Sequence, residues 1–437
     1  MKPYPRYKDS GVEWIGEVPE HWDSIKLKYL FRWEKGTNAA SYTNSYISHH
    51  SGEYPVYSGQ TENNGILGHI ESFDYDFENI ILFVTTVGAK AMSLKRMSGR
   101  FSLSQNCALI IPHDIKITCS SYYFYFLQRL FSYEKNAISL IMQPSLRFED
   151  LNQYSVFSLS HSEQTTIAAY LDRKTAEIDN LIANKERLIE LYEEKKQAVI
   201  NEAVTKGLNP DAEMKDSGVE WLGEIPKHWD AIKLKLCISS IDQGWSPQCE
   251  AQQADNNEWG ILKVGCVNGE HFDSFQNKKL PDALPPRLQC KIQQNDIIVS
   301  RANIRDLVGL AALVEEDYPN ILLCDKLFRF RSRDNIANAK FLVYYIRSST
   351  SRMQIEERAT GASSSMQNIS QSVIKDLCIA LPPLDEQISI VAHIVQKMSL
   401  IDQIITRTKR GINLFKEYRT ALISEAVTGK IDVRDAG

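Results

Sequence analysis

The feature that most constrains this chain is an internal repeat. Residues 7–30 recur as residues 214–237, and 17 of the 24 positions are identical at a constant offset of 207. A second match, at an offset of 223, aligns the segment from Ser162 with the segment from Asp385. The stretches between these matches barely resemble each other. The chain therefore reads as constant, variable, constant, and then the same again.

The second match predicts two long amphipathic helices. In each copy apolar residues recur every seven positions, with a second row four residues behind, and Lys185 interrupts the first row. The residues predicted to pair the helices are Leu171, Ile178, Ile182, Ile189, Tyr192, Val199, Ile394, Ile401, Ile405, Ile412, Phe415 and Leu422. A helix of roughly 40 residues with one apolar stripe cannot bury that stripe alone and needs a partner.

Two arrangements satisfy this need. Each helix could pack on its own domain, or the two helices could pair with each other, antiparallel, across a pseudo-two-fold axis. Equal length, equal phase and the shared repeat favour the pair. The sequence therefore predicts an α+β fold, in which two mixed, strand-rich domains are separated by two long helices that form an antiparallel coiled coil. Such a pair would act as a ruler between the variable domains.

Helix breakers place the boundaries of these parts. Gly207 and Asn209-Pro210 end the first helical block, and Pro382-Pro383 precedes the second. The predicted segments are a first variable domain with its lead-in (1–160), a central helical spacer (161–213), a second variable domain with its lead-in (214–383) and a distal helical region (384–437).

Both variable blocks alternate short strand-like runs with polar turns. The predicted strands are residues 54–57, 80–84 and 107–111 in the first block and residues 260–264, 296–300 and 327–330 in the second. Helices are predicted near residues 121–132 and 339–346.

Polar loops in these blocks carry the side-chain types that pair with the edges of nucleic-acid bases. The candidates are Gln60, Asn63, Asn64, Lys90, Lys95, Arg96 and Arg100 in the first block and Arg301, Asn303, Arg305, Ser363, Ser364 and Gln367 in the second. No acidic residue lies between Asn79 and Pro112. A solvated loop is the alternative for any one of these residues. As a group, placed on the variable parts, they favour contact with nucleic acid.

Each constant lead-in carries two tryptophans eight residues apart, Trp14 and Trp22 in the first copy and Trp221 and Trp229 in the second. These tryptophans could pack as a structural base beneath each variable domain. Alternatively, they could form an exposed docking surface, because tryptophan often anchors protein interfaces. Packing is the favoured interpretation.

Composition places the chain among globular proteins. Hydrophobic residues make up 43% and charged residues 24%, and we find no apolar run approaching the roughly 18 residues of a membrane span. The N-terminus lacks the apolar stretch of a signal peptide, so a cytoplasmic location is expected. The eight cysteines show no C-x-x-C spacing, which predicts reduced thiols and no metal site.

The net charge of −5 is awkward for a nucleic-acid binder, because affinity for phosphates comes from lysine and arginine. A local basic face, or a partner that supplies part of the positive surface, would resolve the conflict.

No catalytic motif points to an enzyme. Gly429-Lys430 lacks the rest of a Walker A loop, and neither the Asn-Pro-Pro-Tyr nor the Asp-Pro-Pro-Tyr tetrapeptide of amino-methyltransferases occurs. The run Glu193-Glu194-Lys195-Lys196 lies in the middle of a predicted helix, where a solvated charged face is expected rather than a nuclease site.

These motifs together resemble the specificity (S) subunits of type I restriction–modification enzymes over essentially the full chain. The most telling matches are the lead-in Ser10–Gly16 and its copy Ser217–Gly223, the helix opener Leu381–Gln387 and the closing segment Leu422–Asp432. Tyr54-Pro55-Val56-Tyr57-Ser58-Gly59 is similar to a common start of a target-recognition domain. The first helix departs from the family in lacking the proline-rich opener.

The resemblance implies a non-enzymatic subunit that reads a bipartite, asymmetric target in double-stranded DNA, one half-site per variable domain. It also implies two methyltransferase (M) subunits bound to the helices and motor-nuclease (R) subunits that join them. S-adenosylmethionine, ATP and magnesium would then belong to the partners. The alternatives are a stand-alone DNA-modifying enzyme with duplicated DNA-binding domains and a scaffold without sequence preference.

Overall fold

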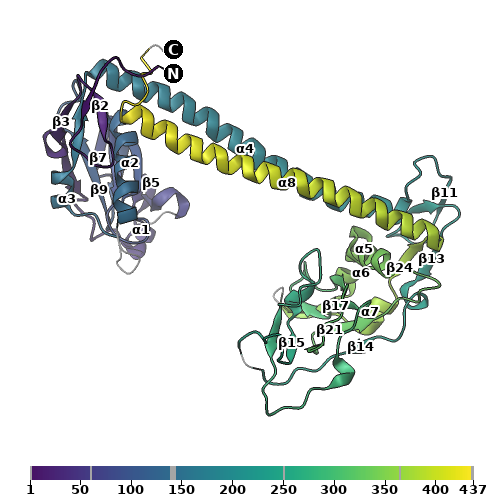
Figure 1. Ribbon diagram of the computed structural model, residues 1–437. Coiled ribbons are helices and arrows are strands. Elements are labelled where there is room, and N and C mark those ends of the chain that lie inside the picture. The colour runs from purple at the N-terminus through teal and green to yellow at the C-terminus, as the bar shows by residue number, and fades with distance from the viewer. Residues whose placement is uncertain (1, 60–61, 138–143, 250, 364–365, 435–437) are drawn as a thin grey trace. The chain divides into compact units, whose positions relative to one another are not determined.

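The chain divides into two compact units. The computed structural model describes residues 2–59, 62–137, 144–249, 251–363 and 366–434. Unit 1 comprises residues 1–186 and 409–437, and unit 2 comprises residues 187–408. Each unit therefore holds one lead-in, one variable block and a part of both long helices (Figure 1).

The two long helices are α4 (His161–Lys206) and α8 (Leu384–Val427). In unit 1 they are joined by an ion pair of 2.9 Å between Arg419 Nε and Asp179 Oδ1, and in unit 2 by one of 2.5 Å between Lys196 Nζ and Asp402 Oδ1. The two pairs are equivalent in the repeat, since an offset of 223 relates Lys196 to Arg419 and Asp179 to Asp402. The helices run antiparallel within each unit, which confirms the predicted coiled coil and its pseudo-two-fold repeat.

The residues predicted to pair the helices avoid solvent. Fully buried are Leu171, Ile178, Ile182, Ile394, Ile401, Ile405, Ile412 and Leu422, and half-buried are Ile189, Tyr192, Val199 and Phe415. Lys185, which interrupts the apolar row, places its ammonium 5.9 Å from the centre of the Phe415 ring. The aliphatic stem and the charge of this lysine are therefore both accommodated at the helix interface.

Helix α8 is more apolar than the sequence analysis expected. It contains an 18-residue window with a mean hydropathy of 1.3, enough by length and composition to cross a membrane. Ile390 and Ile394 of this helix belong to the hydrophobic core of unit 2. Core helices of globular proteins meet the same length and hydropathy criterion, so this single helix is weak evidence for a membrane span.

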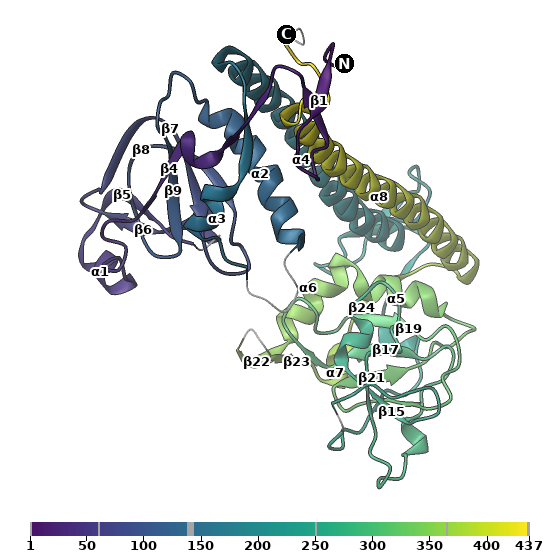
Figure 2. The same ribbon diagram turned by 60° about the vertical axis from the view of Figure 1, so that its left-hand side comes forward.

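The variable block of unit 1 is built on one six-stranded sheet with the strand order β4-β9-β7-β8-β5-β6. Its strands are β4 (Phe31–Lys35), β5 (Ser51–Tyr57), β6 (Ile66–Ile70), β7 (Tyr75–Thr85), β8 (Leu94–Leu103) and β9 (Cys107–Pro112). All neighbours are antiparallel except β5 and β8. Helix α2 (Ser120–Ala137) packs on β7 and β8 (Figure 2), while α1 (Asn44–His49) and α3 (Phe148–Gln153) are short. The predicted strands and the aromatic helix are confirmed.

The variable block of unit 2 is divided among three small sheets. They contain β14 (Asp242–Gln243), β21 (Leu327–Phe330), β17 (Ile297–Ser300) and β19 (Ala311–Leu313); β16 (Asn277–Lys279), β15 (Gly260–Leu262) and β20 (Ile321–Leu322); and β18 (Ala302–Asn303), β23 (Met366–Asn368) and β22 (Thr360–Ser363). The helices are α5 (Ala339–Arg347), α6 (Ser349–Arg358) and α7 (Gln371–Lys375). The two variable blocks are therefore different structures on equivalent frames.

The lead-ins fold alike in both units. Each forms a two-stranded hairpin and a strand that pairs with the segment before the long helix: β1 (Tyr7–Asp9), β2 (Glu17–Pro19) and β3 (Asp23–Lys26) with β10 (Ser155–Ser158), and β11 (Met214–Asp216), β12 (Glu224–Pro226) and β13 (Asp230–Lys233) with β24 (Cys378–Leu381). Trp22 and Trp229 are fully buried, and Trp14 and Trp221 are half-buried. Burial favours the structural base over the exposed docking surface.

A repeated Glu-Gln dipeptide in the first turn of each long helix explains why the lead-ins are constant. The Glu163 carboxylate accepts hydrogen bonds from the indole of Trp22 (3.2 Å) and the hydroxyl of Tyr4 (2.8 Å), and it lies 3.0 Å from His21 Nε2. In the second copy Glu386 accepts from the Trp229 indole at 3.1 Å and lies 2.9 Å from His228 Nε2. The glutamate thus fastens the lead-in to the helix.

The glutamine of the same dipeptide fastens the variable block. Gln164 donates to the carbonyls of Ile117 and Leu159, both at 2.9 Å, and accepts from the amide of Cys119 at 2.7 Å. Its counterpart Gln387 makes the same set with the carbonyls of Ile336 and Pro382 and the amide of Asn338, and both glutamines are buried. The missing proline-rich opener in the first copy therefore leaves the joint unchanged.

Candidate nucleic-acid interface

In unit 1 the structure brings two of the predicted contact residues together. Asn63 and Asn64 lie in a short turn (Glu62–Gly65) and both adopt left-handed backbone conformations, with φ of 47° and 55°. The Lys95 ammonium, on β8, donates to the backbone carbonyl of Asn64 and, at 3.1 Å, to its side-chain oxygen. Asn64 and Lys95 therefore form one polar surface next to Tyr57, whose ring centre is 6.0 Å from the ammonium.

Arg96 has a different role in the fold. Its guanidinium pairs with Asp172 of α4 at 2.7 Å and lies over the ring of Phe124, 4.9 Å from the ring centre. Tyr125 donates to the same Asp172 carboxylate at 2.7 Å. This arginine thus joins the variable block of unit 1 to the long helix. In this structure its guanidinium is paired with a carboxylate.

The remaining candidates of unit 1 are not gathered with Asn64. Arg100, on the same strand as Lys95, is paired with Asp76 at 2.9 Å and lies over Phe73. Lys90 is exposed in the connection between β7 and β8. Gln60 lies outside the described residues.

In unit 2 two groups that are distant in sequence meet on one small sheet. Strand β18 carries Asn303, β23 carries Gln367, and these two residues are direct partners in the antiparallel register. The Asn303 amide donates to the side chain of Asn268 at 3.1 Å. The sequence predicted that Asn303 and Gln367 lie on separate polar loops. The pairing of β18 with β23 makes the two residues neighbours.

The other candidates of unit 2 surround this sheet. Arg301 donates to the carbonyl of Asp325 at 3.4 Å, and Arg305 lies 3.6 Å from Glu356 with 67% of its side chain exposed. Ser363 ends β22, and Ser364 lies outside the described residues.

A basic groove adjoins the same sheet. It has a volume of about 430 Å³, and its lining includes Lys263, Lys278 and Lys326 together with one carboxylate, that of Asp325. Lys278 stands opposite Ile261 in the register of β16 and β15. The carbonyl of Lys326 accepts a hydrogen bond from the backbone amide of Arg301 at 2.8 Å, so the backbone of one groove residue is bonded to the residue that precedes β18.

No local sequence signal marks these three lysines. Lys263 follows β15, Lys278 belongs to β16 and Lys326 directly precedes β21, and more than 60 residues separate the first from the last. The tertiary fold brings them to one surface. The groove is a local basic face, since its lining carries three positive charges and one negative charge.

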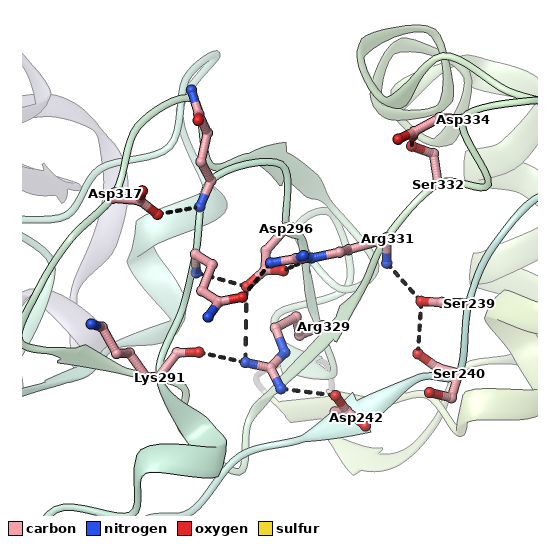
Figure 3. A network of polar contacts seen from close by, with 12 residues as sticks. Ser239, Ser240, Asp242, Lys291, Asp296, Asp317, Arg329, Arg331, Ser332 and Asp334 are labelled. Carbon is pink, nitrogen blue, oxygen red and sulfur yellow. Dashed lines mark hydrogen bonds and ion pairs between the residues drawn. The ribbon is translucent and has the colours of Figure 1, made fainter.

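A network of ion pairs and hydrogen bonds in unit 2 surrounds Asp296 and Arg329 (Figure 3). Asp296, 2% exposed, accepts from Arg331 Nε at 2.7 Å and from the amide of Gln293 at 2.8 Å. Arg329 donates to the carboxylate of Asp242 at 2.8 Å and to the carbonyl of Lys291 at 2.6 Å. These bonds join β14, β21 and the residue that precedes β17, so the network stabilises the four-stranded sheet of unit 2.

No group of three or more His, Cys, Asp or Glu side chains suited to a metal ion occurs among the described residues. Burial raises the pKa of several thiols, to about 12 for Cys107 and about 11 for Cys324. These cysteines are therefore protonated core residues and poor nucleophiles at neutral pH.

A comparison with protein-family models matches this chain twice to the type I restriction modification DNA specificity domain, at residues 19–191 and 241–414. The two matches cover most of the chain and correspond to its two repeats.

Among curated proteins, the type I restriction enzyme EcoEI specificity subunit of Escherichia coli is 28% identical over 221 residues, which is 50% of this chain and 37% of that protein. The MjaVIII specificity subunit of Methanocaldococcus jannaschii is 23% identical over 429 residues, 96% of this chain and 95% of that protein. The chain thus spans little more than a third of the first relative and nearly all of the second.

Solved structures share the fold. A chain from a study of complex assembly and conformational transition of the type I R-M system aligns with a TM-score of 0.69 at 13% identity, covering 95% of this chain and 99% of that one. The HsdS subunit from Thermoanaerobacter tengcongensis aligns with a TM-score of 0.53 at 14% identity, covering 95% and 98%. With two matched specificity domains on a repeated frame, this chain belongs to the family of type I restriction–modification specificity subunits.

Proposed function

We propose that this chain is a non-catalytic subunit that reads a bipartite, asymmetric target in double-stranded DNA. The observation that carries the proposal is in unit 2, where Lys326 of the lysine groove is bonded through its carbonyl to the segment that leads into the sheet of Asn303 and Gln367. Lysines at phosphates position a protein on DNA without reading its sequence, while amide and guanidinium groups discriminate bases. The two parts of this surface fit these two tasks.

The asymmetry of the target follows from the two variable blocks. A six-stranded sheet supports Asn64 and Lys95 in unit 1, whereas a three-stranded sheet supports Asn303 and Gln367 in unit 2. Different surfaces select different base sequences, each good bidentate contact discriminating by about 1–3 kcal/mol. The long helices would set the unread gap between the half-sites.

Methyltransferase subunits would dock on the long helices. Both helices keep large apolar side chains exposed, and two of these, Leu191 (46% exposed) and Leu414 (56% exposed), are equivalent at the repeat offset of 223. Two equivalent surfaces support two methyltransferase subunits, with motor-nuclease subunits joining that complex. S-adenosylmethionine, ATP and magnesium would be bound by those partners, and the complex would act in the cytoplasm.

A domain exchange tests the modular interpretation of the target. Replacing residues 31–161 with the corresponding block of another specificity subunit is expected to change one half of the methylated sequence and leave the other half and the gap unchanged. The readout is genome-wide methylation mapping in cells that contain the partner subunits. A change in both halves would contradict the proposal.

The lysine groove has its own test. Changing Lys263, Lys278 and Lys326 to Gln is expected to weaken the binding of target and random DNA alike, and to lower the slope of log affinity against log salt by about 0.9 for each phosphate that is no longer neutralised. Lys227→Gln, a change of an exposed lysine in the lead-in, is the matched control and should leave the slope unchanged. An unchanged slope in the triple variant would remove the groove from the interface.

Incubation of the purified chain with S-adenosylmethionine and DNA, in the absence of partners, tests the alternative that the chain is a stand-alone DNA-modifying enzyme. We expect no methyl transfer. A scaffold without sequence preference would bind target and random DNA equally at every salt concentration when the partners are present.

A further inference from the structure

Lys196 departs from the rest of its charged run on α4. Glu193, Glu194 and Lys195 are exposed, as predicted, whereas only 9% of the Lys196 side chain is exposed. Its ammonium lies 2.6 Å from Glu270, 2.5 Å from Asp402 and 3.7 Å from Glu193. Burial disfavours the ammonium form, yet hydrogen bonds to Asp402 and Glu270 outweigh it and raise the pKa of Lys196. The lysine is therefore charged throughout the neutral range.

The three carboxylates come from three parts of unit 2. Glu193 is on α4 itself, Asp402 is on the facing helix α8, and Glu270 belongs to the variable block, just after a short helical turn (Val264–Val267). Lys196 thus joins both long helices and the variable block at one point.

The variable-block side of this joint is hydrogen-bonded to α5. The guanidinium of the half-buried Arg347, at the end of α5, donates to the carbonyl of Val267 at 3.3 Å and to that of Ala311 at 2.9 Å. It therefore anchors the turn that leads to Glu270. One turn further along α4 from Lys196, Asn201 accepts the backbone amide of Ser349 at 2.8 Å.

Near Lys196 a cleft lies between the long helices and the variable block, while the apolar pairing of the two helices continues through Ile401 and Ile405. Ala203, Val204 and Ile394 pack the long helices into the hydrophobic core of the variable block. Beyond Ile200 and Met398 a cleft of about 670 Å³ opens, lined by residues of α4, α5, α8 and the Glu270 segment. Across this cleft the Lys196 ion pairs are a direct link between helices and variable block, and they act at a distance from the core contacts.

Two separated attachments fix an orientation, whereas one permits rotation. The buried Gln387 clamps the variable block at the start of α8, and Lys196 holds it about four helical turns farther along, where Asp402 lies 15 residues from Gln387. We propose that Lys196 is a positioning residue for the second half-site: by holding Glu270 and Asp402 together it fixes the angle of the variable block on the helix pair and so restricts the gap length that the subunit accepts. The inference rests on the proposed function, because it assumes a bipartite target.

The repeat supplies a matched control. Arg419 is the counterpart of Lys196 and pairs with Asp179, the counterpart of Asp402, so Arg419→Met removes a helix–helix ion pair in unit 1. In unit 1 the attachment of the variable block uses other residues, Arg96 with Asp172. A change of Arg419 should therefore leave the orientation of both variable blocks unaltered.

The experiment measures methylation by the complete methyltransferase complex on DNA duplexes that carry both half-sites at the natural gap or at a gap one base pair longer or shorter. Lys196→Met and Glu270→Ala are expected to raise the rate on the altered gaps relative to the natural gap by about tenfold, the change that about 1.4 kcal/mol produces. Lys196→Arg is expected to restore discrimination, and Arg419→Met to leave it at the wild-type ratio. The bases read in each half-site should not change.

Glu270→Ala keeps the inference falsifiable if Lys196→Met does not fold, because 53% of the Glu270 side chain is exposed. Wild-type gap discrimination in folded Glu270→Ala and Lys196→Met complexes would overturn the inference. If the wild-type complex itself accepted all three gaps equally, the proposed spacer function would fail instead, so the two failures are distinguishable.

Discussion

Units 1 and 2 share a frame and differ in what the frame carries. In both, a buried tryptophan of the lead-in donates to a glutamate of the long helix, and the next residue, a glutamine, clamps the variable block. Above this frame one unit builds a single six-stranded sheet and the other three small sheets. The repeated residues therefore join the lead-in, the long helix and the variable block in each unit, and these bonds are what we call joints. The surfaces that lie outside the joints differ between the two units.

The joints themselves are not identical. The side chain of Glu163 is 6% exposed and faces Tyr4, His21 and Trp22, whereas that of Glu386 is 28% exposed and faces His228 and Trp229. Unit 1 adds a contact between the two ends of the described chain, where the amide of Asp432 donates to the carbonyl of Lys2 at 2.9 Å. The glutamate joint of unit 1 should therefore be the stronger of the two.

The largest expected effect tests that difference. Glu163→Ala leaves the buried hydroxyl of Tyr4 and the buried indole of Trp22 without their acceptor and removes the partner of the half-exposed His21. It is expected to lower the stability of unit 1 by about 3 kcal/mol, against about 1 kcal/mol for Glu386→Ala in unit 2. Hydrogen–deuterium exchange, read on peptides of each unit, measures both effects. Glu163→Gln keeps an acceptor and should be milder. Equal destabilisation of the two units would break the comparison.

The glutamine clamps should instead be equal. Gln164→Leu and Gln387→Leu each preserve volume but leave one amide and two carbonyl groups of the backbone unpaired, so each is expected to cost about 2 kcal/mol in its own unit. The same exchange measurement reports the destabilisation of each unit. A difference larger than about 1 kcal/mol would show that the missing proline-rich opener weakens the first clamp after all.

The smallest expected effect concerns the stability of the two cores at alkaline pH, where their buried cysteines can ionise. Burial raises the pKa of Cys107 in unit 1 to about 12 and that of Cys324 in unit 2 to about 11, from an ordinary value of 9.0. A thiol held protonated by the fold adds stability below pH 9 that is lost as the pH rises toward the folded pKa.

Between pH 9 and pH 10 each thiol should therefore lower the free energy of unfolding by about 1 kcal/mol. Cys107→Ala or Cys324→Ala should remove that decrease from the pH dependence of the free energy of unfolding measured in urea. Both variants are compared with the wild-type chain over the same pH range. A slope unaffected by either change would mean that these thiols do not titrate with unfolding.

The sequence predicted the helices well because their signal is periodic and long. All twelve predicted pairing residues are buried or half-buried, and α2 and α5 lie where they were expected. The contact residues remain a prediction. Arg96, one of them, pairs in this structure with Asp172 of the long helix, 76 residues away, and no local pattern in the sequence indicates this ion pair.

Contacts between residues distant in sequence also explain why neither the burial of Lys196 nor the lysine groove was predicted. Lys196 belongs to a charged run on a helix, and its burial depends on Glu270 and Asp402, which lie 74 and 206 residues away. Lys263, Lys278 and Lys326 meet because short strands pair, and strands of two or three residues are too short to show a period.

By itself the sequence determined the frame: the repeat, the two long helices, their antiparallel pairing and the positions of the variable blocks. These features follow from apolar periodicity and self-similarity, which are properties of the chain read locally or against itself. The tertiary structure alone decided which polar residues share a surface and which are engaged in joints. That decision depends on contacts between residues distant in sequence, where the same lysine or arginine is a phosphate ligand, a clamp or a solvated charge according to what the fold places beside it.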